Sequence, residues 1–285
     1  MSDKSKLVFR KFLKWRYQNI SNTQFTNIAS AVIGLLTGLA AVTIKNFTHF
    51  IQVLLEGNFI KEIHQAFYFI FPIIGLLLVL LLMKFLIKKR VGHGIPSTLY
   101  AISKQKGIMP RYQMWASLLT APLTVGFGGS VGLEGPTVST GAALGSNLAR
   151  LFHLNQTTRT LLIGAAAAGA MSSIFKAPIA AIVFAVEIFS LELTLASMIP
   201  LLLASITAVL TSYFFFGDDV LLHFNLQDKF ELNDVGFYLL LGVATALISI
   251  YFSKTYFYIA AFFKKFTNPY KRLLIGGFLL GTLVY

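Results

Sequence analysis

The sequence predicts an all-α protein that crosses the membrane several times and contains broken, re-entrant helices. Its 285 residues are 56% apolar and only 12% charged, and their mean hydropathy is +0.72. A soluble domain carries roughly twice this charged fraction, so most of the surface must face lipid. The same composition excludes intrinsic disorder, and the absence of cysteine excludes disulfides and thiolate metal sites.

Residues 1–26 are predicted to form a basic amphipathic segment on the cytoplasmic face of the membrane. Six basic residues alternate here with apolar ones, namely Lys4, Lys6, Arg10, Lys11, Lys14 and Arg16. Such a helix lies in the membrane interface and does not cross it. Two apolar runs separate this segment from basic clusters at 84–90 and 104–111. The positive-inside rule therefore places all three in the cytoplasm and explains the net charge of +13 without nucleic acid as a partner.

The rest of the chain contains a series of apolar runs that are candidates for membrane spans. A bilayer span needs about 20 mostly apolar residues. The longer runs occupy residues 28–55, 66–83, 114–133, 160–175, 193–217, 235–253 and 273–285. Two further runs, 135–149 and 177–186, are too short to cross alone, and each begins beside a Gly-Pro or Ala-Pro pair. They are either parts of kinked full spans or half-helices that line a cavity, as in transport sites.

A weak internal repeat divides the membrane part into two. Residues 33–39 (IGLLTGL) are similar to residues 241–247 (LGVATAL), and each stretch opens a long span. Chance is the alternative explanation, because glycine, alanine and leucine recur in any membrane protein. If the match is genuine, residues 27–217 form a first membrane repeat, and residues 218–285 begin a second that is apparently truncated.

Two glycine-rich segments are candidates for binding an anion. They are Gly92-His93-Gly94-Ile95-Pro96 and Gly132-Leu133-Glu134-Gly135-Pro136. Both lead into predicted helices, so backbone N–H groups and the positive end of a helix dipole can bind an anion there without a basic side chain. Transport requires binding of this moderate strength, because the ion must also leave.

Glu134 is the strongest single candidate for function. A carboxylate between two apolar runs is costly in a membrane, and such residues are functional candidates by default. Its carboxylate is attracted to the same N–H groups as a diffusing anion, so it can block the site when ionised and move away when protonated or displaced. The alternative is a structural role, in which Glu134 stabilises the first turn of an interfacial helix.

A third motif, FKAPIAAIVFAVE, follows these two segments at residues 175–187. In their order and spacing, the three motifs resemble those of the CLC family of chloride channels and chloride/proton antiporters. The resemblance implies an inverted-repeat membrane fold and a homodimer with one anion pathway in each subunit, and the composition leads us to expect the cell membrane as its location. It implies that Glu134 gates the pathway and that residues 92–96 and 132–136 surround the anion. Chloride or a similar small inorganic anion is then the transported ion, and neither a cofactor nor enzyme activity is expected.

The chain departs from the family pattern at three positions. His93 stands where the family usually has serine, so either its ring or only the backbone serves the ion. Leu133 replaces the usual basic residue before Glu134, which weakens anion attraction at the outer entrance. Glu187 matches the first of two acidic positions and Ile188 the second, so Glu187 is either part of a proton path or a helix-end residue. Both a voltage-gated-type chloride channel and a proton-coupled antiporter remain open.

Two further parts of the family's anion site, a Gly-x-Phe-x-Pro loop and a late tyrosine, have no counterpart in the sequence. Tyr285 is the last residue and is not that tyrosine. A second hypothesis is therefore a non-transporting structural or degenerate membrane subunit. The scattered histidines show no metal-ligand spacing, so no metal site is expected.

Overall fold

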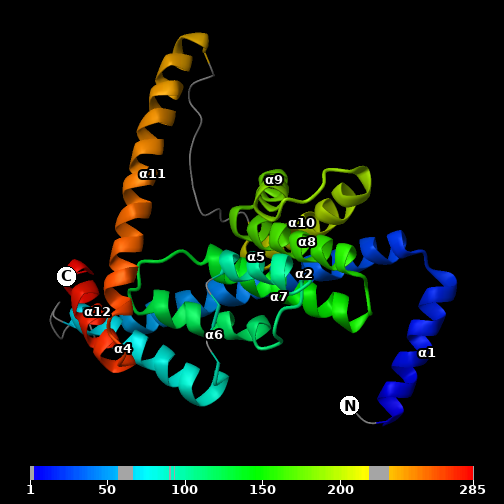
Figure 1. The fold of residues 1–285 in the computed structure, drawn as a ribbon, viewed down its shortest axis with the longest axis horizontal. Helices are drawn as coiled ribbons and strands as arrows, with labels where there is room; N and C mark the ends of the chain where they lie inside the picture. Colours follow the sequence, from blue (N-terminus) through cyan, green and yellow to red (C-terminus); the bar gives the residue numbers. More distant parts are fainter. Residues whose placement is uncertain (1–2, 57–66, 90, 93, 218–230, 285) are drawn as a thin grey trace.

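The computed structural model describes residues 3–56, 67–89, 91–92, 94–217 and 231–284. These residues form helices and connecting loops, without a strand among them (Figure 1). Within this part of the chain, five helices are long and apolar enough to cross a membrane. The predicted all-α, multi-pass fold is therefore confirmed. His93, whose ring was a candidate ligand, lies outside the described residues.

The first half of the chain contains α1 (Asp3–Asn19), α2 (Asn22–Glu56), α4 (Phe67–Leu82) with a π-helical turn at Met83–Ile87, α5 (Ile95–Lys104) and α6 (Gln113–Gly126). The second half contains α7 (Glu134–Leu151), α8 (Gln156–Phe175), α9 (Pro178–Phe189), α10 (Leu195–Phe216), α11 (Val235–Lys264) and α12 (Pro269–Val284). A short 3-10 turn at Leu232–Asp234 precedes α11.

The two short apolar runs form separate half-helices and are not parts of kinked spans. The run at 135–149 belongs to α7, which residues 127–133 separate from α6. The run at 177–186 belongs to α9, which has only 12 residues. Between α8 and α9 the backbone of Lys176 turns into the left-handed region (φ 53°), and Pro178 at the start of α9 has no N–H to continue the preceding helix. The prediction of broken helices is therefore confirmed.

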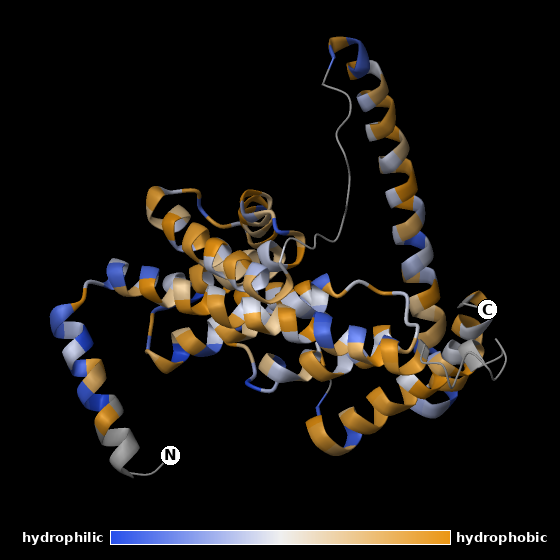
Figure 2. Ribbon diagram, turned by 180° about the vertical axis from the view of Figure 1, so that it is seen from behind, coloured by the Kyte–Doolittle hydropathy of each residue, from blue (hydrophilic) through white to orange (hydrophobic). Residues whose placement is uncertain are grey.

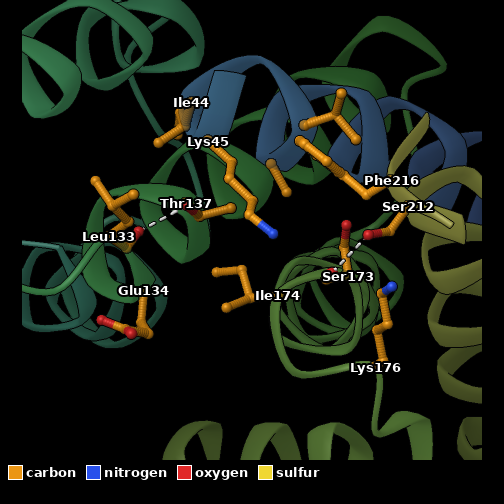
Figure 3. A pocket seen from close by; sticks show the side chains of 12 residues that line it. Ile44, Lys45, Leu133, Glu134, Thr137, Ser173, Ile174, Lys176, Ser212 and Phe216 are labelled. Carbon is orange, nitrogen blue, oxygen red and sulfur yellow. Dashed lines mark hydrogen bonds between the residues drawn. The ribbon is translucent and has the colours of Figure 1, made fainter. Parts of the chain in front are cut away.

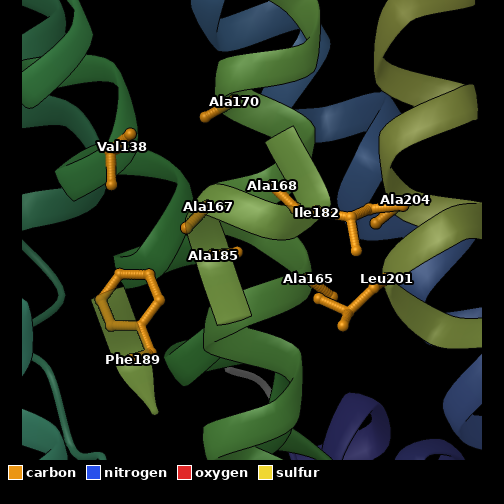
Figure 4. Packing of buried hydrophobic residues seen from close by; sticks show 10 residues of the cluster. All are labelled: Val138, Ala165, Ala167, Ala168, Ala170, Ile182, Ala185, Phe189, Leu201 and Ala204. Atoms are coloured by element: carbon orange, nitrogen blue, oxygen red, sulfur yellow. The ribbon is translucent and has the colours of Figure 1, made fainter. Parts of the chain in front are cut away.

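Helices α2, α7, α8 and α10 pack into a central bundle through small residues. A buried cluster from α7, α8, α9 and α10 forms the centre (Figure 4), consisting of Val138, Ala165, Ala167, Ala168, Ala170, Ile182, Ala185, Phe189, Leu201 and Ala204. A β-carbon at Gly34 of α2 would overlap with Ala204 and Thr207 of α10. Small side chains allow such close backbone approach, which replaces the hydrophobic driving force that is lost in lipid.

The N-terminal helix α1 extends from one end of this bundle (Figure 1) and is tied to it by Arg16. The guanidinium of Arg16 is fully buried, lies 4.1 Å from the ring centroid of Phe25 and 4.5 Å from that of Tyr17, and donates a 2.9 Å hydrogen bond to Asn22. The membrane helix α2 begins at Asn22, four residues before the predicted boundary at residue 26.

The last two helices differ in their packing. Helix α12 lies against α4 at the other end of the bundle, where the rings of Phe69 and Phe278 meet edge to face at 5.2 Å. Helix α11 stands away from the bundle (Figure 1), and none of its residues is buried although most of its length is apolar (Figure 2). A helix that is apolar on all sides belongs in lipid or in a protein interior.

Candidate functional site

The starts of α5 and α7 lie side by side in the structure. Gly94 precedes α5 with φ +58° and ψ −125°, a conformation that residues with a side chain rarely adopt. Pro96 in the first turn fixes φ for the helix without needing a hydrogen-bond acceptor. A β-carbon on Gly94 would lie 3.3 Å from the backbone oxygen of Gly135 in α7. The fold therefore brings together two segments that are about 40 residues apart in the sequence.

These two helix starts border a cavity of about 590 Å³. Its lining includes Gly92, Gly94, Ile95 and Pro96 from the first segment and Gly132, Gly135 and Pro136 from the second. The first N–H groups of a helix have no partner within that helix, and the helix dipole adds positive potential at this end. This cavity, here called the helix-start cavity, can therefore hold an anion through backbone groups.

The helix-start cavity has a further wall that was not predicted from the sequence. Ser117, Thr120 and Thr124 of α6 line it, and Tyr256 of α11 also reaches it. Spacings of three and four residues put the three hydroxyl residues on one face of α6. This stripe is visible in the sequence as the polar residues of the run at 114–133, and it could have indicated which face of that helix meets the cavity.

Glu134 is the first residue of α7 and is half-buried. Its carboxylate folds back over Gly132, where a β-carbon would overlap with Oε2. The next turn is fixed by Thr137, whose N–H and hydroxyl both donate to the carbonyl of Leu133, at 3.0 and 2.7 Å. The carboxylate is thus held at the connection between α6 and α7.

A second cavity, of about 170 Å³, lies beside the same turn of α7 (Figure 3). Leu133 and Glu134 line it together with Lys45, Ser173 and Lys176, none of which was singled out as a site residue from the sequence. The residues next to Glu134 on both sides, Gly132 and Gly135, line the helix-start cavity instead. The segment 132–136 therefore separates two cavities, and Glu134 belongs to the wall between them.

Glu187 does not join this group of candidate residues. It lies near the end of α9, is exposed, and lines neither cavity. Its neighbour Ile188 packs against the central cluster. Among the described residues there is also no group of three or more His, Cys, Asp or Glu side chains that could hold a metal ion.

Comparison with known proteins gives one family match. The sequence model of the family described as "Voltage gated chloride channel" matches residues 74–285. The H(+)/Cl(-) exchange transporter ClcA of Vibrio cholerae is 26% identical over 262 residues, which cover 88% of this chain and 56% of that protein. An uncharacterized protein of Methanocaldococcus jannaschii is 30% identical over 200 residues, which cover 68% of this chain and 49% of that protein. The chain thus spans about half the length of the curated relatives it matches.

Two solved structures have a similar fold. A slow cyanobacterial Cl⁻/H⁺ antiporter superimposes with a TM-score of 0.78 at 20% identity, covering 91% of this chain and 63% of that one. A CLC-type fluoride/proton antiporter superimposes with a TM-score of 0.74 at 24% identity, covering 93% of this chain and 66% of that one.

Proposed function

Since the chain belongs to the CLC family of voltage-gated chloride channels, we propose that it takes part in moving chloride or a similar small anion across a membrane. The ion's path includes the helix-start cavity, and Glu134 gates it. The exchange-transporter name of the Vibrio cholerae relative supports transport rather than catalysis as the class of function.

The observation that carries this proposal is the meeting of two helix starts at one cavity. An anion that leaves water loses its hydration and needs compensating donors. The first turns of α5 and α7 offer backbone N–H groups from two directions, and Ser117 of α6 adds a hydroxyl to the lining. The hydroxyls of Thr120 and Thr124 already donate to carbonyls of their own helix. Dipoles and neutral donors bind a halide without the strong attraction of a full positive charge, so the ion can also be released.

The gating role of Glu134 is supported by its position in the wall between the two cavities. Its ionised carboxylate has the same charge as the transported ion and competes for the same N–H groups at the start of α7. Movement of this side chain away from Gly132 then alters access to the helix-start cavity. Protonation removes the negative charge and favours this movement.

The proposal includes a homodimer in the cell membrane. Helices α9 and α10 carry exposed apolar residues, among them Ile179, Val183, Leu202 and Leu210. In a membrane this face is covered either by lipid or by a second copy of the chain. Single-molecule photobleaching of labelled protein in liposomes counts the subunits, and two bleaching steps are expected.

Chloride efflux from liposomes containing the purified protein tests the proposal. Efflux above that of protein-free liposomes is expected, and Glu134→Gln should change its rate or abolish its response to pH. Glu192→Gln is a matched control, because Glu192 is an exposed carboxylate that lines neither cavity. Absence of efflux would favour the non-transporting subunit, and an unchanged rate and pH response in Glu134→Gln would remove this residue from gating.

The same liposomes distinguish a channel from an antiporter. An imposed chloride gradient drives protons uphill only if the two fluxes are coupled. Proton movement under these conditions identifies an antiporter, while chloride efflux without it identifies a passive channel.

A further inference from the structure

The smaller cavity, here called the lysine cavity, lies between residues 41–45 of α2, the last turns of α8 and α10, and the first turn of α7. Lys45 comes from α2, Ser173 from the last turn of α8, and Lys176 from the break between α8 and α9. We propose that the lysine cavity is a second anion site, which binds a small inorganic anion through the two ammonium groups and the hydroxyl of Ser173.

Both lysines are fixed by the last turn of α10. The ammonium of Lys45 lies 4.4 Å from the ring centroid of Phe216. The ammonium of Lys176 lies 4.5 Å from the ring centroid of Tyr213 and donates a hydrogen bond to the carbonyl of Gly217. An ammonium is attracted to an aromatic face and to the negative end of a helix. The two positive charges are therefore held at the lysine cavity and do not extend away from it.

Ser173 supplies an independent indication of a ligand. Its side chain is only 4% exposed, and its hydroxyl has no hydrogen-bond partner among the described residues. Its backbone carbonyl, in contrast, accepts a 2.9 Å hydrogen bond from the hydroxyl of Ser212. In the view of Figure 3 the Ser173 hydroxyl lies between the two ammonium groups, whereas the carboxylate of Glu134 points away from them. A buried hydroxyl without a partner is costly, and an anion at this position would accept its proton.

Charge and size also fit a small anion. Two lysines and one glutamate line the cavity, so the described lining has a formal charge of +2 − 1 = +1. The other lining residues include Val42, Ile44 and Ile174, which lower the local dielectric constant and strengthen the attraction. A volume of about 170 Å³ accommodates a partly hydrated inorganic ion but is below the range of about 300–1,000 Å³ usual for larger organic ligands.

The position of the lysine cavity suggests its role, and this step rests on the proposed function. Helix α2 leaves the basic N-terminal segment at Asn22, and Lys45 lies about 35 Å further along it at 1.5 Å per residue. This distance places Lys45 at the outer side of the membrane, opposite the cytoplasmic basic clusters. Leu133, the residue just before Glu134, carries no charge and also lines this cavity. Lys45 and Lys176 supply the positive charge that attracts anions to the same entrance.

Bromide provides a probe for the binding site, because its anomalous scattering locates it in crystals of the full chain. A peak among Lys45, Ser173 and Lys176 is expected, and it should disappear in the double variant Lys45→Met/Lys176→Asn. Asparagine is chosen because it tolerates the left-handed backbone at position 176. Ser173→Ala is a second variant that breaks no side-chain hydrogen bond of the described structure, and it should lower the occupancy of the peak.

The positions of the bromide peaks distinguish the second anion site in the lysine cavity from the proposed transport site in the helix-start cavity. A peak in the helix-start cavity alone overturns the second site and leaves the proposed function intact. A peak in the lysine cavity alone supports the second site and contradicts the proposed transport site. A peak that is unchanged in the double variant and in Ser173→Ala overturns the assignment of its ligands.

Chloride flux at low ionic strength tests the role. The double variant should need about threefold to tenfold more chloride for half-maximal flux, since local positive charge raises the anion concentration at an entrance. The rate at saturating chloride should stay unchanged, and Lys45→Arg/Lys176→Arg should retain the original chloride dependence. Lys104→Met removes an exposed charge from the end of α5 and should have no effect. An unchanged chloride dependence in the double variant would reduce the bound bromide to an adventitious ion only.

Discussion

The carboxylate of Glu134 lies directly over the α-carbon of Gly132, in the space that a β-carbon at position 132 would occupy. Only glycine at position 132 leaves room for the side chain of Glu134 to fold back toward the loop between α6 and α7. The position of the candidate gate thus depends on a residue that has no side chain of its own.

Gly132→Ala should therefore displace the carboxylate of Glu134. The backbone at position 132 has no positive φ, so the main effect is the overlap with Oε2. We expect the chloride flux of Gly132→Ala to change in the same direction as that of Glu134→Ala, by about twofold to tenfold, equivalent to roughly 0.4–1.4 kcal/mol. Efflux from liposomes measures this rate.

A double variant provides the control for this prediction. If Gly132 acts through Glu134, adding Gly132→Ala to Glu134→Ala should produce no further change. Additive effects of the two substitutions would contradict the prediction, because they would show that Gly132 acts independently of the carboxylate.

Gly94→Ala should destabilise the start of α5. The backbone conformation of Gly94 (φ +58°, ψ −125°) costs an alanine about 1–3 kcal/mol, and its β-carbon would also press on the carbonyl of Gly135. Thermal unfolding of the purified protein should show a lower midpoint. Gly236→Ala is the matched control, because a β-carbon there meets nothing within 4 Å and the residue lies in α11 with an ordinary φ. Equal midpoints for the two variants would argue against strain at Gly94.

Arg16→Ala should loosen α1 from the bundle. The substitution removes the ring contact with Phe25 and the hydrogen bond to Asn22, which both join α1 to α2, and one cation–π contact contributes about 0.5–2 kcal/mol. The chain has no cysteine, so a spin label on Val8→Cys reports on α1 without competing sites. Greater label mobility is expected in Arg16→Ala than in Arg10→Ala, since Arg10 is exposed. Equal mobility would show that Arg16 does not hold the helix.

Glu187→Gln should leave chloride flux within about twofold of the original rate, a difference of roughly 0.4 kcal/mol in barrier height. Glu187 is exposed and lines neither of the two cavities, so the loss of its charge has little effect on the anion path. Parallel recordings of proton movement show whether it serves a proton path. A large loss of chloride flux would place Glu187 closer to the anion path than its position on α9 indicates.

The broken helices could be predicted from the sequence because the proline and glycine residues that break them lie at the helix ends themselves. The run at 177–186 became α9, Pro178–Phe189, because the proline that starts it is visible in the sequence. The run at 193–217 became α10, Leu195–Phe216, with each end within two residues of the prediction. Composition and glycine-proline pairs therefore predicted most of the helical fold, and the meeting of helices α5 and α7 followed from the family resemblance.

The lysine cavity could not be predicted in this way. Lys45 and Lys176 are 131 residues apart and come together only through the packing of α2, α8 and α10. In the sequence Lys45 appears as a single charge within the run at 28–55 and Lys176 as a single charge between two runs, and isolated lysines of this kind commonly extend toward the membrane interface. The partnerless hydroxyl of Ser173 is likewise a property of the packed structure, since serine is common in membrane helices.

The unburied helix α11 makes the protein sensitive to the thickness of the bilayer. Its uncharged run at 235–253 extends about 28 Å, close to the roughly 30 Å of the hydrocarbon core, and the helix continues past Lys254 to Lys264. A bilayer of another thickness no longer matches this run, and the mismatch is relieved by a change in the tilt of the helix or by a local change in the thickness of the lipid. Because Tyr256 of α11 borders the helix-start cavity, each change of tilt also moves one wall of that cavity. Lipid chain length thereby becomes a physical variable that acts on the site through a single helix.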